Sequence, residues 1–309
     1  MNVRETVDEA TRRLAAAGVP SARHDAEALA AHVLGVDRRD LWRHDEIEPR
    51  AQNSYEALVV RRERREPLQH LSGVAYFRHL TLAVGPGVFV PRPETELVAG
   101  VAIDEARRIA STGRTPVVVD LGTGSGAIAR SVADEVPAAV VHAVELAEDA
   151  LMWAKRNLDG SRVQLHRGDL ATVLPELDGS VDVVVSNPPY IPVGSVPRDP
   201  EVRDYDPELS LYAGDDGLDV IRVIQQVAAR LLRPGGLVVV EHADEQGTSA
   251  PSVFHAHGWG GIVDNDDLAG RPRFVTARRA GSAKHTATLD DEAWARETEG
   301  SEDQPQSRP

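Results

Sequence analysis

The sequence contains no cysteine, few aromatic residues and almost no lysine. Across its 309 residues Phe, Trp and Tyr together make up 4%, and Lys155 and Lys284 are the two lysines. The absence of cysteine excludes disulfide bonds, cysteine-bound zinc, iron–sulfur clusters and a thiol nucleophile. The sequence has no apolar run of the ~18 residues that a membrane-spanning helix needs, and the first residues lack the apolar segment of a signal peptide. We therefore expect a cytoplasmic protein that does not enter the membrane.

Hydrophobic residues make up 41% of the chain and its net charge is −15, too small a charge to keep so apolar a chain unfolded. The charge is uneven, because residues 1–115 are net neutral whereas residues 116–280 carry −11. Nucleic-acid-binding domains usually carry a basic surface, since neutralising phosphates supplies much of their affinity. The acidic central part of the chain therefore argues against a nucleic acid as the substrate.

Residues 1–75 have the apolar periodicity of short helices. Val3, Val7 and Leu14 recur at helical spacing, and Ser21 is a candidate cap for a second helix. Four arginines and two glutamates are interleaved over residues 61–66. This mixture of charges favours a solvated helix end over a dedicated contact. We expect residues 1–75 to form a small helical domain.

The pattern changes to strands after residue 75. Apolar residues at 80–84 and 88–90 flank Gly85-Pro86-Gly87, which predicts a β-hairpin within a linker at 76–92. From 93 to 280 strands alternate with helices: the expected strands are 116–121, 140–145, 162–166, 181–186, 236–242 and 273–278, and the expected helices 94–110, 125–135, 148–158 and 217–232. This alternation predicts an α/β fold with a Rossmann-like, doubly wound and mostly parallel sheet. Residues 281–309 are polar and acidic and predict a disordered tail.

A glycine-rich turn follows the first strand of this alternating region. Its residues are Gly122, Thr123, Gly124, Ser125 and Gly126. Glycines let the backbone approach a ligand closely, and Glu145 at the end of the next strand can accept hydrogen bonds from both hydroxyls of a ribose. The pair predicts an adenosine-containing cofactor and leaves NAD and S-adenosylmethionine open, although Gly-x-Gly-x-Gly after Asp120 favours the latter. Asp169, after the third strand, is either a contact for the adenine amino group or a solvated loop residue.

The fourth strand ends in Asn187-Pro188-Pro189-Tyr190. The Asn187 side-chain oxygen and the Pro188 carbonyl can accept both hydrogens of one planar NH2 group, while Tyr190 offers an aromatic face. An amide nitrogen is a poor nucleophile because its lone pair is delocalised into the carbonyl. Polarising both N–H bonds and directing the nitrogen at a sulfonium methyl lowers the barrier to methyl transfer through positioning and electrostatics. This segment therefore favours a methyltransferase over a dehydrogenase.

Residues 120–126 and 187–190 together resemble the class I S-adenosylmethionine-dependent methyltransferases that modify planar amino groups. Within that group, residues 89–96 and 205–219 are similar to the PrmC/HemK family, and the similarity extends over roughly residues 5–280. Those enzymes methylate the glutamine side-chain nitrogen in the Gly-Gly-Gln loop of class I peptide-chain release factors.

The resemblance implies a role for each motif. Residues 122–126, Glu145, Asp169, Leu170 and Asn187 would bind S-adenosylmethionine, although Leu170 stands where many relatives carry an aromatic residue. Residues 187–190 would bind the glutamine, with Asn187, Pro188 and Tyr190 as the catalytic residues. Class I release factors would be the protein substrates.

Two other functions remain open, and no metal is expected. The same segment could serve an enzyme that methylates the amino group of adenine or cytosine in a nucleic acid. A protein that binds S-adenosylmethionine without catalysis is the other alternative. His255 and His257 have no third metal ligand in view, and methyl transfer from a sulfonium is a direct displacement that needs no metal.

Overall fold

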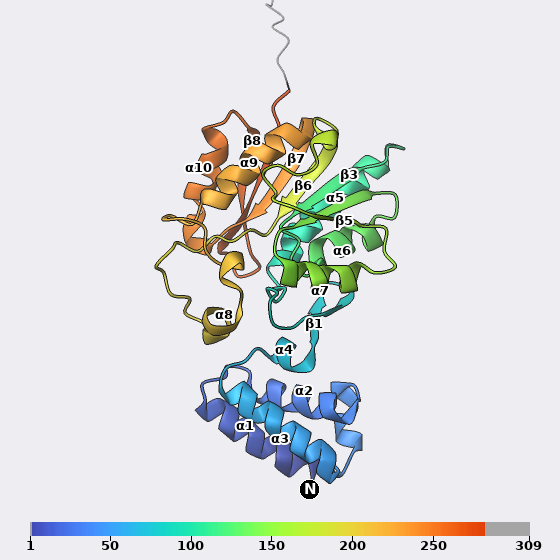
Figure 1. Cartoon of the computed structure of the whole chain (residues 1–309), viewed down its shortest axis with the longest axis vertical. Coiled ribbons are helices and arrows are strands. Elements are labelled where there is room, and N and C mark those ends of the chain that lie inside the picture. Colours follow the sequence, from blue (N-terminus) through green and yellow to red (C-terminus); the bar gives the residue numbers. More distant parts are fainter. Residues whose placement is uncertain (1, 282–309) are drawn as a thin grey trace, which may run out of the picture.

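A computed structural model describes residues 2–281 as a helical domain and a sheet-based domain joined by a short linker (Figure 1). Residues 282–309, which include nearly all of the expected tail, lie outside the described residues. Among the described residues no helix is long and apolar enough to cross a membrane.

The helices begin and end close to the expected positions. The α-helices are α1 (Val3–Ala16), α2 (Ala22–Leu34), α3 (Pro49–Glu63), α4 (Leu68–Ser72), α5 (Thr95–Ala110), α6 (Ala127–Glu135), α7 (Glu148–Leu158), α8 (Pro200–Tyr205), α9 (Asp219–Leu231) and α10 (Ser249–His255). Short 3₁₀ turns are η1 (Arg38–Arg43), η2 (Pro175–Leu177), η3 (Glu208–Ser210) and η4 (Asp244–Gln246). The short helices α8 and α10 were not predicted, because segments this short show little apolar periodicity.

The helical domain packs α1, α2 and α3 around one apolar core that includes Leu14, Leu29 and Tyr55. The Asn2 side chain caps α1 by accepting a hydrogen bond from the backbone N–H of Arg4 at 2.9 Å. Ser21 is the N-cap residue of α2, as expected, but its side chain accepts no hydrogen bond from the helix backbone. Its hydroxyl instead donates to the Asp25 carboxylate at 2.8 Å, so the α2 N-terminus has no side-chain cap.

The linker contains a β-hairpin, but it lies earlier in the chain than the apolar pattern predicts. Strand β1 (Val74–Phe77) pairs with β2 (Leu80–Ala83) across a tight turn at Arg78 and His79. The expected second strand at 88–90 does not form. Val88 and Val90 are apolar because they pack with Ala150 of α7 in a small buried cluster, not because they pair with a strand.

The sheet-based domain has the predicted doubly wound architecture. Its strands are β3 (Val117–Leu121), β4 (Val140–Glu145), β5 (Gln164–Arg167), β6 (Val181–Ser186), β7 (Leu232–Glu241), β8 (Gly260–Asp266) and β9 (Pro272–Arg278). They lie in the order β5-β4-β3-β6-β7-β9-β8, with β3 to β7 parallel and β8 and β9 antiparallel at one end. The apolar cores place α5, α6 and α7 on one face and α9 and α10 on the other. Strand β8 was missed because it is an exposed edge strand with few apolar residues.

The topology also determines where a ligand can bind. From β3 the chain continues outward through β4 and β5 and then returns to add β6 and β7 on the other side. In open α/β sheets the crevice at the carboxyl ends of the strands, where this direction reverses, is the usual ligand site. The glycine-rich loop follows β3, Glu145 is the last residue of β4, and the segment that starts at Asn187 follows β6.

Candidate active site

A cavity of about 240 Å³ lies at the carboxyl ends of β3, β4 and β6. It brings together most of the residues that the sequence singled out: residues 122–125, Glu145 and residues 187–190. Two further segments contribute to its lining, one before and at the start of α5 and one at α8 and just after it. These residues are Gly87, Phe89, Pro91, Arg92, Thr95, Val202, Pro207, Leu209, Ser210 and Leu211.

The glycine-rich loop presents bare backbone to this cavity. Gly122, Gly124 and Gly126 have φ values of 71°, 57° and 85°, in the left-handed region that other residues seldom adopt. A Cβ atom at Gly122 or Gly124 would meet nothing within 4 Å, so these positions face open space. A Cβ at Gly126 would come within 3.1 Å of the Leu158 side chain, so this glycine permits close packing of α6 against α7. The loop thus has the shape of a cradle for a small ligand.

Glu145 is buried and its carboxylate holds the loop as well as facing the cavity. It accepts hydrogen bonds from the backbone N–H groups of Gly124 at 2.8 Å, Leu146 at 2.9 Å and Ala147 at 2.8 Å. A carboxylate has about four acceptor positions, so these three bonds leave capacity for a hydroxyl of a ligand. Sequence reasoning assigned Glu145 to the ligand alone and missed its contact with the loop.

Asp120 lies behind the loop and is completely buried. Its Oδ2 accepts hydrogen bonds from the Thr123 hydroxyl at 2.6 Å and the Ala129 N–H at 3.1 Å, while Oδ1 has no partner among the described residues. Burial raises the pKa of Asp120 to about 7, and the two hydrogen bonds oppose that rise. The carboxyl therefore changes its charge near neutral pH, at the base of the loop.

The Asn187 side chain is oriented by a neighbouring hydroxyl. Its Nδ2 donates to Thr95 Oγ1 at 3.0 Å, and among the described residues its Oδ1 accepts no hydrogen bond. Asn187 lines the cavity together with Pro188, Pro189 and Tyr190. The acceptor end of this amide is therefore left available for a donor in the cavity.

A second buried carboxyl group lies beside this pair. Glu241, at the end of β7, lies beside the side chains of Thr95 and Tyr190, and its buried Oε2 has no hydrogen-bond partner among the described residues. Burial raises the pKa of Glu241 to about 7, although Thr95 and Tyr190 act in the opposite direction, and burial, with the nearby Glu241, also raises the pKa of Tyr190. Sequence reasoning missed both Thr95 and Glu241; the signal for Thr95 was its place in the segment 89–96.

Asp169 and Leu170 lie outside the lining of the cavity. They follow β5, the strand next to β4, and so belong to the same edge of the sheet. Asp169 is exposed and its Oδ1 accepts the Ala171 N–H at 2.9 Å, whereas Leu170 packs against the apolar core below α9. Their contact with an adenine remains a prediction.

The other wall contains a largely buried ion pair between Arg92 and Asp206. Arg92 donates to Asp206 Oδ2 at 2.8 Å and its guanidinium lies 4.9 Å from the centre of the Phe89 ring. Asp206 is buried, which raises its pKa to about 6 although the Arg92 charge acts in the opposite direction. This pair ties the segment that precedes α5 to the residues that follow α8.

Comparisons with known proteins agree with this arrangement. Residues 5–73 match a family described as the PrmC N-terminal domain, and residues 118–196 match one described as a methyltransferase domain. The chain is 58% identical to the release factor glutamine methyltransferase of Streptomyces coelicolor, over 89% of this chain and 97% of that protein. It is 49% identical to the enzyme of the same name from Mycolicibacterium smegmatis, over 90% and 98%.

A third relative has a different name. The chain is 42% identical to the 4-amino-L-phenylalanine/4-methylamino-L-phenylalanine methyltransferase of Streptomyces pristinaespiralis, over 82% of this chain and 87% of that protein. The higher identities extend over nearly the full length of both partners and include the helical domain. The chain therefore belongs to the release factor glutamine methyltransferase family.

Proposed function

We propose that this chain transfers a methyl group from S-adenosylmethionine to the side-chain amide nitrogen of the glutamine in the Gly-Gly-Gln loop of class I release factors. The observation that carries the proposal is the position of Asn187. Its unpaired Oδ1 shares one cavity with an open glycine-rich loop, so an acceptor for an amide N–H lies close to a place for the methyl donor. Membership of the family supports the same reaction.

The residues at one end of the cavity fit S-adenosylmethionine. The bare backbone at Gly122 and Gly124 can approach the ligand, and Glu145 retains an acceptor position for a ribose hydroxyl. The bound cofactor supplies an electrophilic methyl group on a sulfonium. The acidic groups nearby, Asp120 and Glu145, favour a ligand of positive charge.

The residues at the other end fit a primary amide. Asn187 Oδ1 and the Pro188 carbonyl accept hydrogen bonds from the two N–H groups of the substrate amide, while Pro189 and Tyr190, which also line the cavity, flank the plane of that amide. The bond from Nδ2 to Thr95 keeps Oδ1 directed away from Thr95. Positive charge develops on the substrate nitrogen during transfer, so both acceptors bind the transition state more tightly than the ground state.

The helical domain favours a protein substrate. Residues 5–73 match the PrmC N-terminal domain, and a lone glutamine side chain offers little surface for specificity. A release factor is also a cytoplasmic molecule, which places the proposed reaction in the cytoplasm. One relative is named as a methyltransferase of 4-amino-L-phenylalanine. An arylamine is therefore the alternative acceptor to compare with a release factor.

The proposal is tested by incubating the chain with methyl-labelled S-adenosylmethionine and one acceptor at a time. The acceptors are a class I release factor, the same factor with the loop glutamine replaced by alanine, duplex DNA, and 4-amino-L-phenylalanine. We expect label on the unaltered release factor alone. Label on the DNA or the arylamine but not on the release factor would contradict the proposal, and binding of the cofactor without any transfer would identify a non-catalytic protein.

A further inference from the structure

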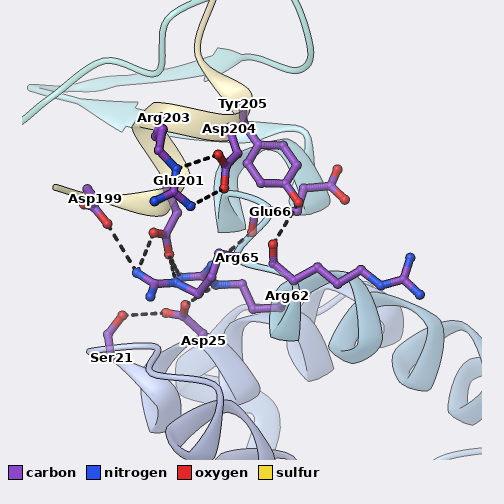
Figure 2. Close-up of polar contacts among 11 residues, drawn as sticks. Ser21, Asp25, Arg62, Arg65, Glu66, Asp199, Glu201, Arg203, Asp204 and Tyr205 are labelled. Carbon is purple, nitrogen blue, oxygen red and sulfur yellow. Dashed lines mark hydrogen bonds and ion pairs between the residues drawn. The ribbon is translucent and has the colours of Figure 1, made fainter. Parts of the chain in front are cut away.

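A cluster of ionised side chains joins the helical domain to α8 (Figure 2). Arg62, near the end of α3, donates to Glu201 at 2.7 Å, and Arg65 donates to both oxygens of the same carboxylate at 2.7 and 2.5 Å. Arg65 also contacts Asp199 at 3.2 Å, and the Tyr205 hydroxyl donates to the backbone carbonyl of Arg64 at 2.9 Å. The interpretation of residues 61–66 as a solvated helix end is therefore wrong, because two of these arginines pair with the other domain.

The side chains at the centre of the cluster are buried, whereas Asp199 at its edge is exposed. The side chains of Arg62, Asp25 and Glu201 are only 5%, 3% and 11% exposed. Removing one partner of a buried ion pair leaves the other charge without compensation, which is far more costly than losing a surface pair. Burial acts to raise the pKa of Glu201, but the hydrogen bonds from Arg65 and Arg62 outweigh it and lower this pKa to about 2. Glu201 is thus ionised at any physiological pH.

The same short stretch of chain forms one wall of the cavity. We call residues 199–211 the wall segment; Val202, Pro207, Leu209, Ser210 and Leu211 within it line the cavity. Figure 1 shows α8 between the sheet and the helical domain. The wall segment thus has the cavity on one side and, through Glu201, the helical domain on the other.

Apart from Glu201, the wall segment is held by further contacts that include the hydrogen bond from the Ile191 N–H to the Leu211 carbonyl at 2.8 Å. It belongs to the long connection between β6 and α9, whose only regular structure is α8 and the turn η3. Arg92 ties Asp206 to the segment that precedes α5. Within the wall segment Leu209 is 59% exposed, whereas Leu211 is buried.

We propose that Glu201 is a positioning residue, through which Arg62 and Arg65 of the helical domain hold the wall segment in the shape that receives the acceptor. The inference rests on the proposed function for the identity of that acceptor. It assigns the helical domain a task inside this chain, in addition to any contact with a protein substrate. The glycine-rich loop and Glu145 come from other segments, so loss of the contact should affect the acceptor and leave the cofactor site intact.

Two variants break the contact from opposite sides. E201Q removes the charge at nearly constant size, while Arg62 keeps its bond to Asp25 at 2.7 Å. R65Q acts from the other domain and leaves the pair between Arg62 and Glu201 in place, so it remains informative should E201Q fold poorly. D204N is the matched control: Asp204 lies on the same helix, is 45% exposed, and pairs with Arg203 instead of the helical domain.

Amide hydrogen exchange of the full-length chain measures directly how often the wall segment opens. The amides of Arg203 and Asp206 donate to the carbonyls of Asp199 and Val202, so their exchange reports opening of this segment. We expect both test variants to accelerate this exchange at least tenfold, to lower kcat/KM for the release factor at least tenfold, and to keep the Kd for S-adenosylmethionine within threefold. D204N should behave as the unaltered chain does.

Three results would overturn the inference: exchange within twofold of the unaltered chain in both test variants, the same acceleration in D204N, or faster exchange with unchanged kcat/KM. A purely structural role would lower the melting temperature without these changes. Failure of the unaltered chain to methylate a release factor would reject the proposed function instead. Hydrogen exchange and cofactor binding would still decide whether Glu201 positions the wall segment.

Discussion

Replacing Asn187 with alanine removes both ends of its side-chain amide, and each end has a different role. The Nδ2 end donates to Thr95 Oγ1 at 3.0 Å, and loss of one such bond lowers the free energy of unfolding by ~0.5–1.5 kcal/mol. The Oδ1 end is the proposed acceptor for the substrate N–H. Removing one preorganised partner of a developing charge costs ~10²–10³ in kcat, or ~2.7–4 kcal/mol in the barrier. The activation barrier should therefore rise by more kcal/mol than the free energy of unfolding falls.

Cofactor affinity should change much less than the rate, because residues 122–125 and Glu145 provide most of the proposed cofactor contacts. Asn187→Asp is the sharper probe. A carboxylate can still accept the substrate N–H, but it places a full charge close to the buried Glu241, which also contacts Thr95. We expect the aspartate variant to be slower than the unaltered chain and faster than the alanine variant.

The measurements are single-turnover methylation of a release factor and calorimetric binding of S-adenosylmethionine for all three proteins. Thermal unfolding gives the stability change separately. If Asn187→Ala loses as many kcal/mol in cofactor binding as in the rate, then Asn187 is a cofactor or structural residue. The amide would then need a different acceptor.

Further predictions concern other residues of the site and the C-terminal residues 282–309. Thr95→Val removes the hydroxyl that orients Asn187 and should slow single-turnover methylation at least tenfold, whereas Thr95→Ser should retain most of the rate; equal rates would show that Thr95 does not set the amide orientation. Glu145→Ala should weaken S-adenosylmethionine binding by ~1–3 kcal/mol, and an unchanged Kd in calorimetry would remove Glu145 from the site. Asp120 and Glu241, with pKa values of about 7, should ionise more fully beside a cationic ligand, so binding should release protons and tighten as pH rises from 6 to 8. Calorimetry in two buffers of different ionisation enthalpy detects this release, and identical apparent enthalpies would contradict it. Deleting residues 282–309 should leave the melting temperature and the methylation rate nearly unchanged, since this segment has few apolar residues to stabilise an ordered structure; a loss of several degrees would show that it docks.

The sequence by itself determined the sheet and the ligand loop. Strands β4 and β6 coincide with the predicted 140–145 and 181–186, because central parallel strands are buried on both faces and read as unbroken apolar runs. The glycines at 122, 124 and 126 could be recognised because a left-handed backbone is a local property of the residue. Strand β8 and the true hairpin were not predictable in the same way. An edge strand needs few apolar residues. Val88 and Val90 are apolar because they pack in a small buried cluster, and not because they belong to a strand.

Only the tertiary structure decided what surrounds the Asn187 amide and what holds the cavity wall. Thr95 meets Asn187 because α5 begins beside the end of β6, and Glu241 lies close to Thr95 because β7 is the neighbour of β6 in the sheet. Arg65 pairs with Glu201, 136 positions later in the chain, so neither residue's neighbours in sequence indicate the contact. Ionic contacts of this kind leave no periodic pattern, because the same charged residues serve equally well on a solvated surface. Local periodicity therefore predicts burial and backbone conformation, whereas the pairing of polar side chains depends on how the chain folds back on itself.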